Sequence, residues 1–464
     1  MRWVWGLLGI SVAGGAIAQD GQWYTQGDFE PLQRVAVQVT NPLNLDRPNA
    51  PVIIAFDEFP VQDIAEMLVT VVDPSLPPAP QPTREERVRG GPHLLQKESN
   101  GHAIFHQLDD LDKDGVWDEL YFTTDLAAGE EKTIYVYFGF NQRGWNPHGT
   151  HAGIGSYARH IVPFWESRHI GWKLWFPGSA DVYAKRKGQL MSQRLYMDNW
   201  DGYVVPDDMG SDIQGVDETF GAGSICLFED SEDLSQVARP RFTPLARRQP
   251  APTKFNSGQL SDTRYAYDVV VNGPLRSAVR IKIINWETGK GAYEAEQICF
   301  AYASENYSRC RVTFPVFEPR IDAVLPGAGF RKKPQENAFY QKGGVTISGG
   351  PETIRNPDEK LAIEGQLKVE FIGGAMVVPD QYAPEYVYRE ETHGDEVQGN
   401  HLFRITPDEN GSFEYMIAGA WSEGEVLTNY QAFKEYVLNA ASGMNTPVNV
   451  SFSELQYKEP RPEE

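Results

Sequence analysis

The sequence predicts an all-β protein: a large antiparallel β-sandwich, supersandwich-like, with minor helices. Strand-length segments, in which β-branched and aromatic residues alternate with polar ones, recur along the chain and end at turn residues; examples are RVAVQVTN (34–41), KTIYVYFGF (132–140), YAYDVVVNG (265–273), SAVRIKIINW (277–286) and KVEFIGGAMVV (368–378). Helical periodicity is convincing only near the C-terminus, where Tyr430, Phe433, Val437 and Ala440 share a face and Thr428 or Asn429 can cap the first turn. Many short strands joined by turns are typical of stacked antiparallel sheets.

The chain has 464 residues, more than one ordinary domain. We expect a signal peptide over residues 1–18, an N-terminal β-sandwich part over 19–145, a main β-sandwich domain over 146–458 and a charged tail over 459–464. The internal boundary falls where NQRGWNPHGTHAGIGS (141–156) interrupts the strand pattern.

The first 18 residues, MRWVWGLLGISVAGGAIA, carry one early positive charge and an apolar run too short to span a bilayer as a helix. They end in Ala16-Ile17-Ala18, the small-x-small pattern that signal peptidase requires. We therefore expect cleavage before Gln19, a periplasmic or extracellular mature protein, and no membrane association after cleavage. The alternative is an uncleaved membrane anchor.

The formal net charge is −22, from 42 Lys and Arg against 64 Asp and Glu. A field of this sign argues against nucleic acid as a partner. Residues 165–200 differ from this overall negative charge, because they carry six basic and three acidic side chains. Such a local cluster can hold an anionic group at bond distance; the alternative is a solvated face with internal ion pairs.

Three cysteines are too few for a disulfide scaffold. If AYASENYSR (301–309) is a hairpin that turns at Ser304-Glu305, Cys299 and Cys310 face each other and can form a cross-strand disulfide. Two free buried thiols are the alternative, and Cys226 is expected in the core.

The segment DLDKDGVWDE (110–119) resembles a calcium loop. Asp110, Asp112 and Asp114 fall at positions 1, 3 and 5, and Asp118 at position 9, but position 12 is Tyr121 instead of an acid. The loop is either a structural Ca²⁺ site or a plain acidic turn. No cofactor is required by any other motif: HExxH, a Cys/His cluster and GxSxG are all absent from the sequence.

Several segments, in this order, resemble a family of secreted bacterial proteins known as a domain of unknown function, which includes ulvan oligosaccharide dehydratases. They are VTNPLNLDRPNAPVII (39–54), QLDDLDKDGVWDEL (107–120), DVYAKRKGQL (181–190), GSDIQGVDETFGAG (210–223), VVNGPLRSAVRI (270–281), NHLFRI (400–405) and YMIAGAW (415–421). The resemblance implies a galactose-mutarotase-like β-sandwich and an anionic oligosaccharide substrate. It also implies removal of water from a non-reducing-end uronic acid to leave a 4,5-unsaturated sugar. Related sequences often carry a histidine before the Gly-x-Asp stretch, where this chain has Asp207 and Asp208.

Such an elimination requires a cation for the carboxylate, a base for the C5 proton and an acid for the leaving oxygen. We expect Lys185 to neutralise the carboxylate, and Tyr183 and His401 to transfer the protons. The expected substrate-binding residues are Arg168 and Arg186 for the carboxylate, Trp200 and Trp421 for the sugar rings, and Asp212 for a hydroxyl group. Arg276 is expected to be structural.

Two other functions stay open. One is a glycoside hydrolase that uses a pair of carboxylates drawn from Glu166, Asp207, Asp208, Asp212, Asp217 and Glu218. The other is a non-catalytic carbohydrate-binding protein, because sandwiches with exposed aromatic residues often only bind.

Overall fold

A computed structural model describes residues 22–26, 29–61, 63–90, 96–98, 100–140, 147–157, 160–176, 179–192, 209–214, 219–230, 232–234, 236–240, 263–355, 366–393 and 396–458. The expected signal peptide and charged tail lie outside these residues. So do Trp200 and four of the hydrolase candidates, namely Asp207, Asp208, Asp217 and Glu218.

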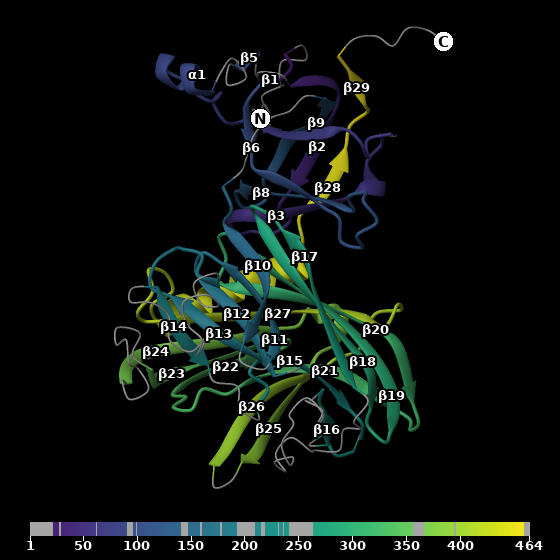
Figure 1. Ribbon diagram of the computed structural model, residues 1–464, viewed down its shortest axis with the longest axis vertical. Helices are drawn as coiled ribbons and strands as arrows, with labels where there is room; N and C mark the ends of the chain where they lie inside the picture. The colour runs from purple at the N-terminus through teal and green to yellow at the C-terminus, as the bar shows by residue number, and fades with distance from the viewer. Residues whose placement is uncertain are drawn as a thin grey trace, which may run out of the picture.

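The described chain is mostly strand, and all of its strand pairs are antiparallel, so the predicted all-β class is confirmed. Figure 1 shows two stacked parts, an upper one built mainly from the N-terminal third and a larger lower one. In the part of the chain that the structure describes, no helix is long and apolar enough to cross a membrane.

The upper part is a sandwich of two sheets with a small two-stranded ribbon. Its larger sheet has the order β28-β2-β9-β4-β6, its smaller sheet β3-β8-β7, and the ribbon β1-β5. The strands are β1 (Thr25–Gln26), β2 (Glu30–Thr40), β3 (Arg47–Ala55), β4 (Leu68–Asp73), β5 (Gln96–Glu98), β6 (His102–Ile104), β7 (His106–Asp109), β8 (Glu119–Leu126), β9 (Glu131–Phe140) and β28 (Asn449–Phe452), with helices η1 (Phe56–Glu58) and α1 (Arg84–Gly90). Alternate residues of these strands, such as Val37, Val52, Phe122 and Val136, are buried and fill the space between the two sheets.

The chain returns to this upper sandwich at its C-terminal end. Strand β28 pairs with β2 from Val37↔Phe452 to Thr40↔Asn449, and β29 (Gln456–Tyr457) pairs with the start of β2. The sequence predicts that residues 449–457 belong to the main domain, whereas their strand partners lie in the N-terminal sandwich. The two parts are therefore joined by more than one crossing of the chain.

The lower part contains three sheets, with the orders β10-β11-β12-β13-β14, β16-β15-β21-β26-β25 and β17-β18-β19-β20-β27-β24-β23-β22. Their strands are β10 (Thr150–Tyr157), β11 (His160–Ser167), β12 (Ile170–Phe176), β13 (Ser179–Lys185), β14 (Gly210–Gln214), β15 (Ala222–Phe228), β16 (Val237–Ala238), β17 (Arg264–Asn272), β18 (Arg276–Glu287), β19 (Gly291–Tyr302), β20 (Tyr307–Pro319), β21 (Leu325–Arg331), β22 (Ala338–Lys342), β23 (Val345–Arg355), β24 (Gln366–Val377), β25 (Glu385–His393), β26 (Glu396–Arg404) and β27 (Ser412–Trp421), with a 3-10 turn η5 (Asp380–Tyr382).

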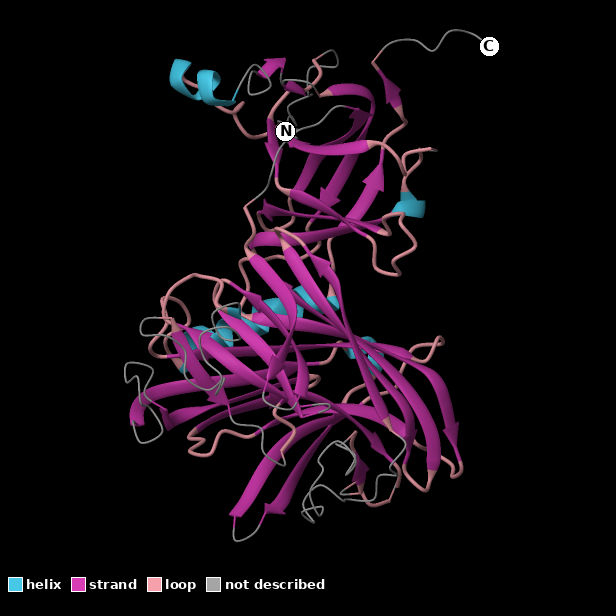
Figure 2. Cartoon of the chain, in the orientation of Figure 1, coloured by secondary structure: helices cyan, strands magenta, loops and turns pink. Residues whose placement is uncertain are grey.

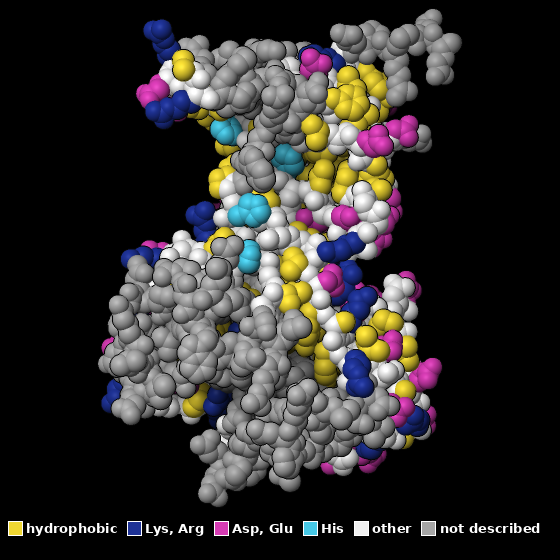
Figure 3. Space-filling view, in the orientation of Figure 1, with side chains coloured by type: hydrophobic (Ala, Val, Ile, Leu, Met, Phe, Trp, Pro, Cys, Tyr) yellow, Lys and Arg dark blue, Asp and Glu magenta, His cyan; other side chains and the backbone are white. Residues whose placement is uncertain are grey.

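One large core fills the space between these sheets. Trp165, Trp172 and Val182 of the five-stranded β10–β14 sheet pack with Ile281 and Ile417 of the eight-stranded sheet. The outer face of the eight-stranded sheet is solvated along β18 and β19, where Arg280 and Lys282 both pair with Glu296, at 3.3 and 3.2 Å. Figure 3 shows basic and acidic side chains intermingled on that edge of the lower part.

The predicted helix is α3 (Tyr430–Asn445), which crosses the top of the lower part (Figure 2). Asn429 caps it, accepting a hydrogen bond from the Ala432 amide at 3.0 Å. Its buried residues Phe433 and Val437 pack on β24. Phe433 lies so close to Gly373 of that strand that no side chain would fit there: an added Cβ at position 373 would lie 2.6 Å from the Phe433 ring.

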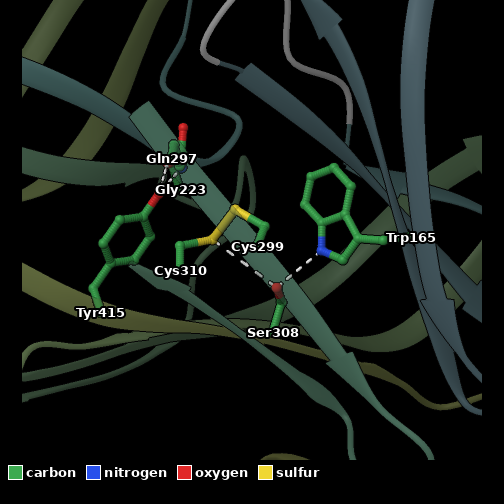
Figure 4. The surroundings of a disulfide bond; sticks show 7 residues. All are labelled: Trp165, Gly223, Gln297, Cys299, Ser308, Cys310 and Tyr415. Carbon is green, nitrogen blue, oxygen red and sulfur yellow. Dashed lines mark hydrogen bonds between the residues drawn. A yellow bond between two sulfur atoms is a disulfide. The ribbon is translucent and has the colours of Figure 1, made fainter. Parts of the chain in front are cut away.

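Of the two alternatives for Cys299 and Cys310, the structure shows the disulfide. Cys299 and Cys310 are direct partners in the β19–β20 register, 4.2 Å apart at Cα, and they are bonded. Figure 4 shows the bond beside Ser308, which accepts a hydrogen bond from the indole of Trp165 at 2.9 Å. Cys226 is buried in the core, as expected.

Arg276 holds the two parts together. Its guanidinium, fully buried at the start of β18, donates to Asp109 of β7 and to Glu119 of β8, the latter at 2.6 Å. Gln107 adds hydrogen bonds with the Arg276 backbone. A structural role for Arg276 is what the sequence predicted.

Candidate active site

The outer face of the β10–β14 sheet carries a buried layer of polar groups. Along β13, Val182 and Ala184 point into the core, so Asp181, Tyr183 and Lys185 share the opposite face. The whole strand is nevertheless buried. The face that the alternation predicted is therefore covered, not open to solvent.

Lys173, Asp181 and Tyr183 form the centre of this layer. The Lys173 ammonium donates a hydrogen bond to the Tyr183 hydroxyl at 2.7 Å and lies 3.3 Å from Asp181 Oδ2. Burial raises the pKa of Asp181 well above its usual range, and the nearby Asp212 carboxylate adds to this, while Lys173 opposes it. The three side chains can therefore hold and move a proton in a site with little water.

Asp212 extends the polar layer towards a neighbouring sheet. It is the direct partner of Tyr183 in the β13–β14 register, and its carboxylate accepts from the Gln214 amide at 2.9 Å. The Gln214 side-chain oxygen accepts from the Lys333 ammonium at 2.7 Å. The contact joins strand β14 to the loop that follows β21.

Lys185 has a different role from the one predicted. Its ammonium donates to the Glu166 carboxylate, to the Ser167 carbonyl and, at 2.8 Å, to the Gln189 carbonyl. An ammonium has three protons, so this set of acceptors is complete and Lys185 is not available to a substrate carboxylate. Glu166 also accepts from the amides of Met191 and Ser192, so the Lys185–Glu166 pair anchors the segment after β13.

His151 and Ser192 lie beside this pair without forming a nucleophilic triad. The Ser192 hydroxyl is hydrogen-bonded to His151 Nδ1, and Glu166 approaches the same nitrogen at 3.9 Å. In a serine–histidine–acid triad the two partners occupy opposite ring nitrogens. Burial lowers the pKa of His151, although Glu166 opposes the shift.

The predicted binding residues Arg168, Arg186 and Trp421 lie around the turn that follows β13, where the Arg168 carbonyl accepts a hydrogen bond from the Gln189 amide at 2.9 Å. Arg168 is exposed in the turn between β11 and β12, and Arg186 is half-buried, 3.9 Å from Glu423. Trp421 cannot stack on a sugar, because it is 2% exposed within the core and its indole donates to the Lys185 carbonyl at 3.1 Å. Trp200 lies outside the described residues.

His401 lies on β26 with both ring nitrogens engaged. Nδ1 is hydrogen-bonded to the Tyr386 hydroxyl at 2.9 Å, and Nε2 to Glu336 at 3.1 Å. The ring stacks on Phe339, with centroids 5.0 Å apart. Burial would raise the pKa of Glu336, but the hydrogen bonds from His401 and Ser348 outweigh it and lower that pKa. His401 is 2% exposed, so it lies one side-chain layer below the surface.

A cavity of about 590 Å³ is lined by three consecutive cations, Arg331, Lys332 and Lys333, and by Tyr388, whose ring lies 5.7 Å from that of His401. We call it the basic cavity. Lys332 lies 3.8 Å from Glu336, the carboxylate that His401 also contacts. Glu390 is the acidic residue of its lining, which also includes Tyr388 and Gly399.

Lys333 connects the basic cavity to the polar layer on β14. It lines the cavity, is 2% exposed and donates to Gln214. Burial lowers its pKa to about 8, and Glu352 opposes the shift. Lys333 also interacts electrostatically with Asp212, the register partner of Tyr183, and its amide donates to Ser348, which is hydrogen-bonded to Glu336 beside His401. Tyr183 and His401 thus belong to one continuous polar region.

The three cations were not among the residues predicted from the sequence. The signal that could have identified them is the run Arg331-Lys332-Lys333, which directly follows the strand LPGAGF in an acidic chain. A run of like charges is more often solvated, and only the fold places this one against a buried histidine.

The acidic loop between β7 and β8 gathers three of its four predicted metal ligands. Carboxylate oxygens of Asp110, Asp112 and Asp118 lie within 4.8 Å of one another. Asp114 is outside that group and accepts from the Val116 amide at 2.7 Å. Oxygen ligands at such spacing suit Ca²⁺.

The family described as "Domain of unknown function (DUF4861)" matches residues 39–450. The chain belongs to this family. No curated protein matched the sequence.

Two solved structures from Enterococcus faecalis are similar, a protein in the glycosyl hydrolase family 38 and an alpha-mannosidase of strain V583. Their identities are 10% and 11%, their TM-scores 0.43 and 0.41, and each alignment covers 91% of this chain. The chain spans about half the length of these two proteins, 47% and 46%.

Proposed function

We propose that this DUF4861 protein eliminates water from the non-reducing-end uronic acid of anionic oligosaccharides, such as ulvan fragments, and leaves a 4,5-unsaturated uronyl residue. The observation that carries the proposal is the basic cavity beside the His401–Glu336 pair. An acidic protein that concentrates three cations in one cavity is suited to hold a carboxylate there.

In the proposed reaction, Arg331 and Lys332 neutralise the uronate carboxylate, which makes the C5 proton more acidic. Arg331 can do so with two parallel hydrogen bonds. Lys333 lines the same cavity, and its lowered pKa makes the neutral amine accessible near neutral pH, so it is the base that removes the C5 proton.

The C4–O bond breaks as the C4–C5 double bond forms, and the departing hydroxide receives a proton and leaves as water. Two groups can supply this proton to the cavity lining: His401, whose ring packs against that of Tyr388, and Tyr183, whose register partner Asp212 interacts with Lys333. Neither lines the cavity itself, so each acts through that neighbour. The variants His401→Ala and Tyr183→Phe distinguish them, since loss of the acid should slow elimination about 10²–10⁴-fold.

The disulfide between Cys299 and Cys310 supports a periplasmic or extracellular location, because such bonds persist in oxidising compartments. Within the proposal, the partner is therefore an oligosaccharide outside the cytoplasm, and neither nucleic acid nor a membrane takes part.

The test is incubation of the protein with saturated uronic-acid oligosaccharides while the ultraviolet absorbance of the conjugated uronate is followed. We expect absorbance to rise for the native protein and to be lost in the Arg331→Met variant. Absorbance that stays flat with every uronate-ended oligosaccharide would exclude the dehydratase.

A glycoside hydrolase is the second candidate, and one observation favours it. Asp181 and Asp212 are close enough to interact electrostatically, and the pKa of Asp181 is raised, mainly by burial. Hydrolases pair a protonated carboxyl group with an ionised one. Release of reducing ends without a rise in absorbance, abolished by Asp212→Asn, would select this reading; binding without either product would indicate a carbohydrate-binding protein.

A further inference from the structure

A second cavity, of about 270 Å³, lies at the junction of the upper and lower parts. We call it the junction cavity. Its walls come from the start of β3, from the turn between β19 and β20, and from one side of α3. It shares no lining residue with the basic cavity, and the proposed elimination does not use it.

A carboxylate and two phenol rings provide the recognition groups of the junction cavity. Glu305 Oε2 accepts a hydrogen bond from the Tyr436 hydroxyl at 2.7 Å, and the Asn306 amide donates to the same phenol oxygen at 2.8 Å. Tyr436 is therefore held in place by both neighbours. The ring of Tyr307 lies 6.2 Å from the ring of Tyr436 and forms part of the same wall.

The charges that line the junction cavity balance. Asp46 and Glu305 oppose Arg47 and Arg309. Arg309 is neutralised by two hydrogen bonds to Glu414, at 2.8 and 2.7 Å. Arg47 donates to the Thr446 carbonyl at 3.1 Å. With Arg309 paired to Glu414, a cation would meet the Arg47 guanidinium and an anion the Asp46 and Glu305 carboxylates, so the lining disfavours ligands that carry a net charge of either sign.

Room for Arg47 is provided by Gly443 of α3. A Cβ at this position would lie 3.1 Å from Arg47 Nη2, closer than such contacts normally are. The helix thus presents a small residue where the guanidinium passes, and the neighbouring Ala440 leaves the cavity open.

We propose that the junction cavity is a binding site for a neutral sugar residue, distinct from the basic cavity. Sugar hydroxyls donate to a carboxylate and accept from a guanidinium, and the C–H faces of a sugar ring pack on aromatic rings. Glu305, Arg47, Tyr307 and Tyr436 supply this combination in one cavity. Its volume lies near the lower end of the range for small-molecule sites, about 300–1,000 Å³, which suits a single sugar residue.

Saturation-transfer NMR on the full chain with glucose, galactose and xylose tests the proposal. We expect at least one of these sugars to bind. Glu305→Gln keeps the shape of the side chain and should weaken that binding about tenfold or more, because one acceptor oxygen is replaced by an NH₂ donor. Ala440→Leu fills the cavity from α3 with a residue that favours helix, and it should abolish the signal.

The matched control is Glu390→Gln, which makes the same change in the basic cavity and should leave neutral-sugar binding unaltered. Thermal unfolding of each variant separates loss of binding from loss of fold. The proposal is overturned if none of the three sugars binds to the native protein, or if a sugar binds equally well to folded Glu305→Gln and Ala440→Leu.

Discussion

The ammonium of Lys173 lies 2.7 Å from the hydroxyl of Tyr183, and both side chains are buried on the outer face of the β10–β14 sheet. A phenol so placed can give up its proton next to a positive charge and recover it through the same contact. Asp181 and Asp212 lie close by, so groups that can exchange a proton are gathered here without a histidine.

The Tyr183→Phe variant tests this centre. The ring stays in its packing with Phe164, so we expect the fold to remain and elimination to slow about 10²–10⁴-fold if Tyr183 is the acid. Rates from the absorbance assay, with circular dichroism as the folding check, give the answer. A folded variant with the native rate would leave His401 as the acid.

Replacing Lys185 by Met should affect stability more than chemistry. Removing one partner of a buried ion pair leaves Glu166 uncompensated, at a cost of about 3–5 kcal/mol in the free energy of unfolding. Denaturant titration measures this. The exposed neighbour Lys187, changed to Met, is the matched control and should cost less than about 0.5 kcal/mol. A Lys185→Met protein of native stability that lacks activity would restore Lys185 to the site.

Lys333 predicts a pH dependence of stability. Its pKa falls from 10.5 to about 8 on folding, because the ammonium is buried. Below pH 8 the group is charged in both states, and its burial destabilises the fold. Between these two pKa values the unfolded chain binds more protons, so stability should increase with pH. The difference in free energy of unfolding between native protein and Lys333→Met should therefore change over this window, and a constant difference would contradict the prediction.

Gly399 keeps the basic cavity open. A Cβ here would lie 2.5 Å from the Tyr388 hydroxyl and 2.9 Å from Lys332 Cδ, both at flexible side chains, so Gly399→Ala should fold with a narrowed cavity. We expect KM for the uronate oligosaccharide to rise about tenfold. Gly188→Ala is the control, because its Cβ would meet no atom closer than 3.7 Å. An unchanged KM would place the substrate elsewhere.

The acidic loop predicts sensitivity to chelators. If Asp110, Asp112 and Asp118 hold Ca²⁺, removal of the ion should lower Tm, because the ion stabilises only the native state. Asp112→Ala should abolish this sensitivity, and Asp114→Ala should retain it, since Asp114 lies outside the group. The same Tm with and without chelator indicates a plain turn.

Local periodicity was enough to predict the strands and α3, and a hairpin count brought Cys299 opposite Cys310, because each depends on residues close in the sequence. The return of β28 to β2 was not predictable, since a four-residue strand has no signal for a partner about 400 residues away. The register of a hairpin can be counted, whereas the pairing of distant strands depends on the whole fold.

The site, too, could be predicted only as far as local patterns in the sequence reach. Alternation along β13 correctly placed Asp181, Tyr183 and Lys185 on one face, but it could not show that Glu166 and the residues up to Ser192 cover Lys185. Nor could it bring Lys333 to Gln214, 119 residues apart in the sequence. Which side of a strand a residue faces is a local property, and what lies above that side is not.

The pairing of β28 with β2 also has a consequence for biosynthesis. The first strands of the upper sandwich leave the ribosome long before Asn449–Phe452, so one edge of β2 stays open while the rest of the chain is made. An open strand edge is a template for wrong pairing with other chains. Secretion in an unfolded state would postpone this exposure until all strands are present, and a chain cut short before residue 449 should be prone to aggregate.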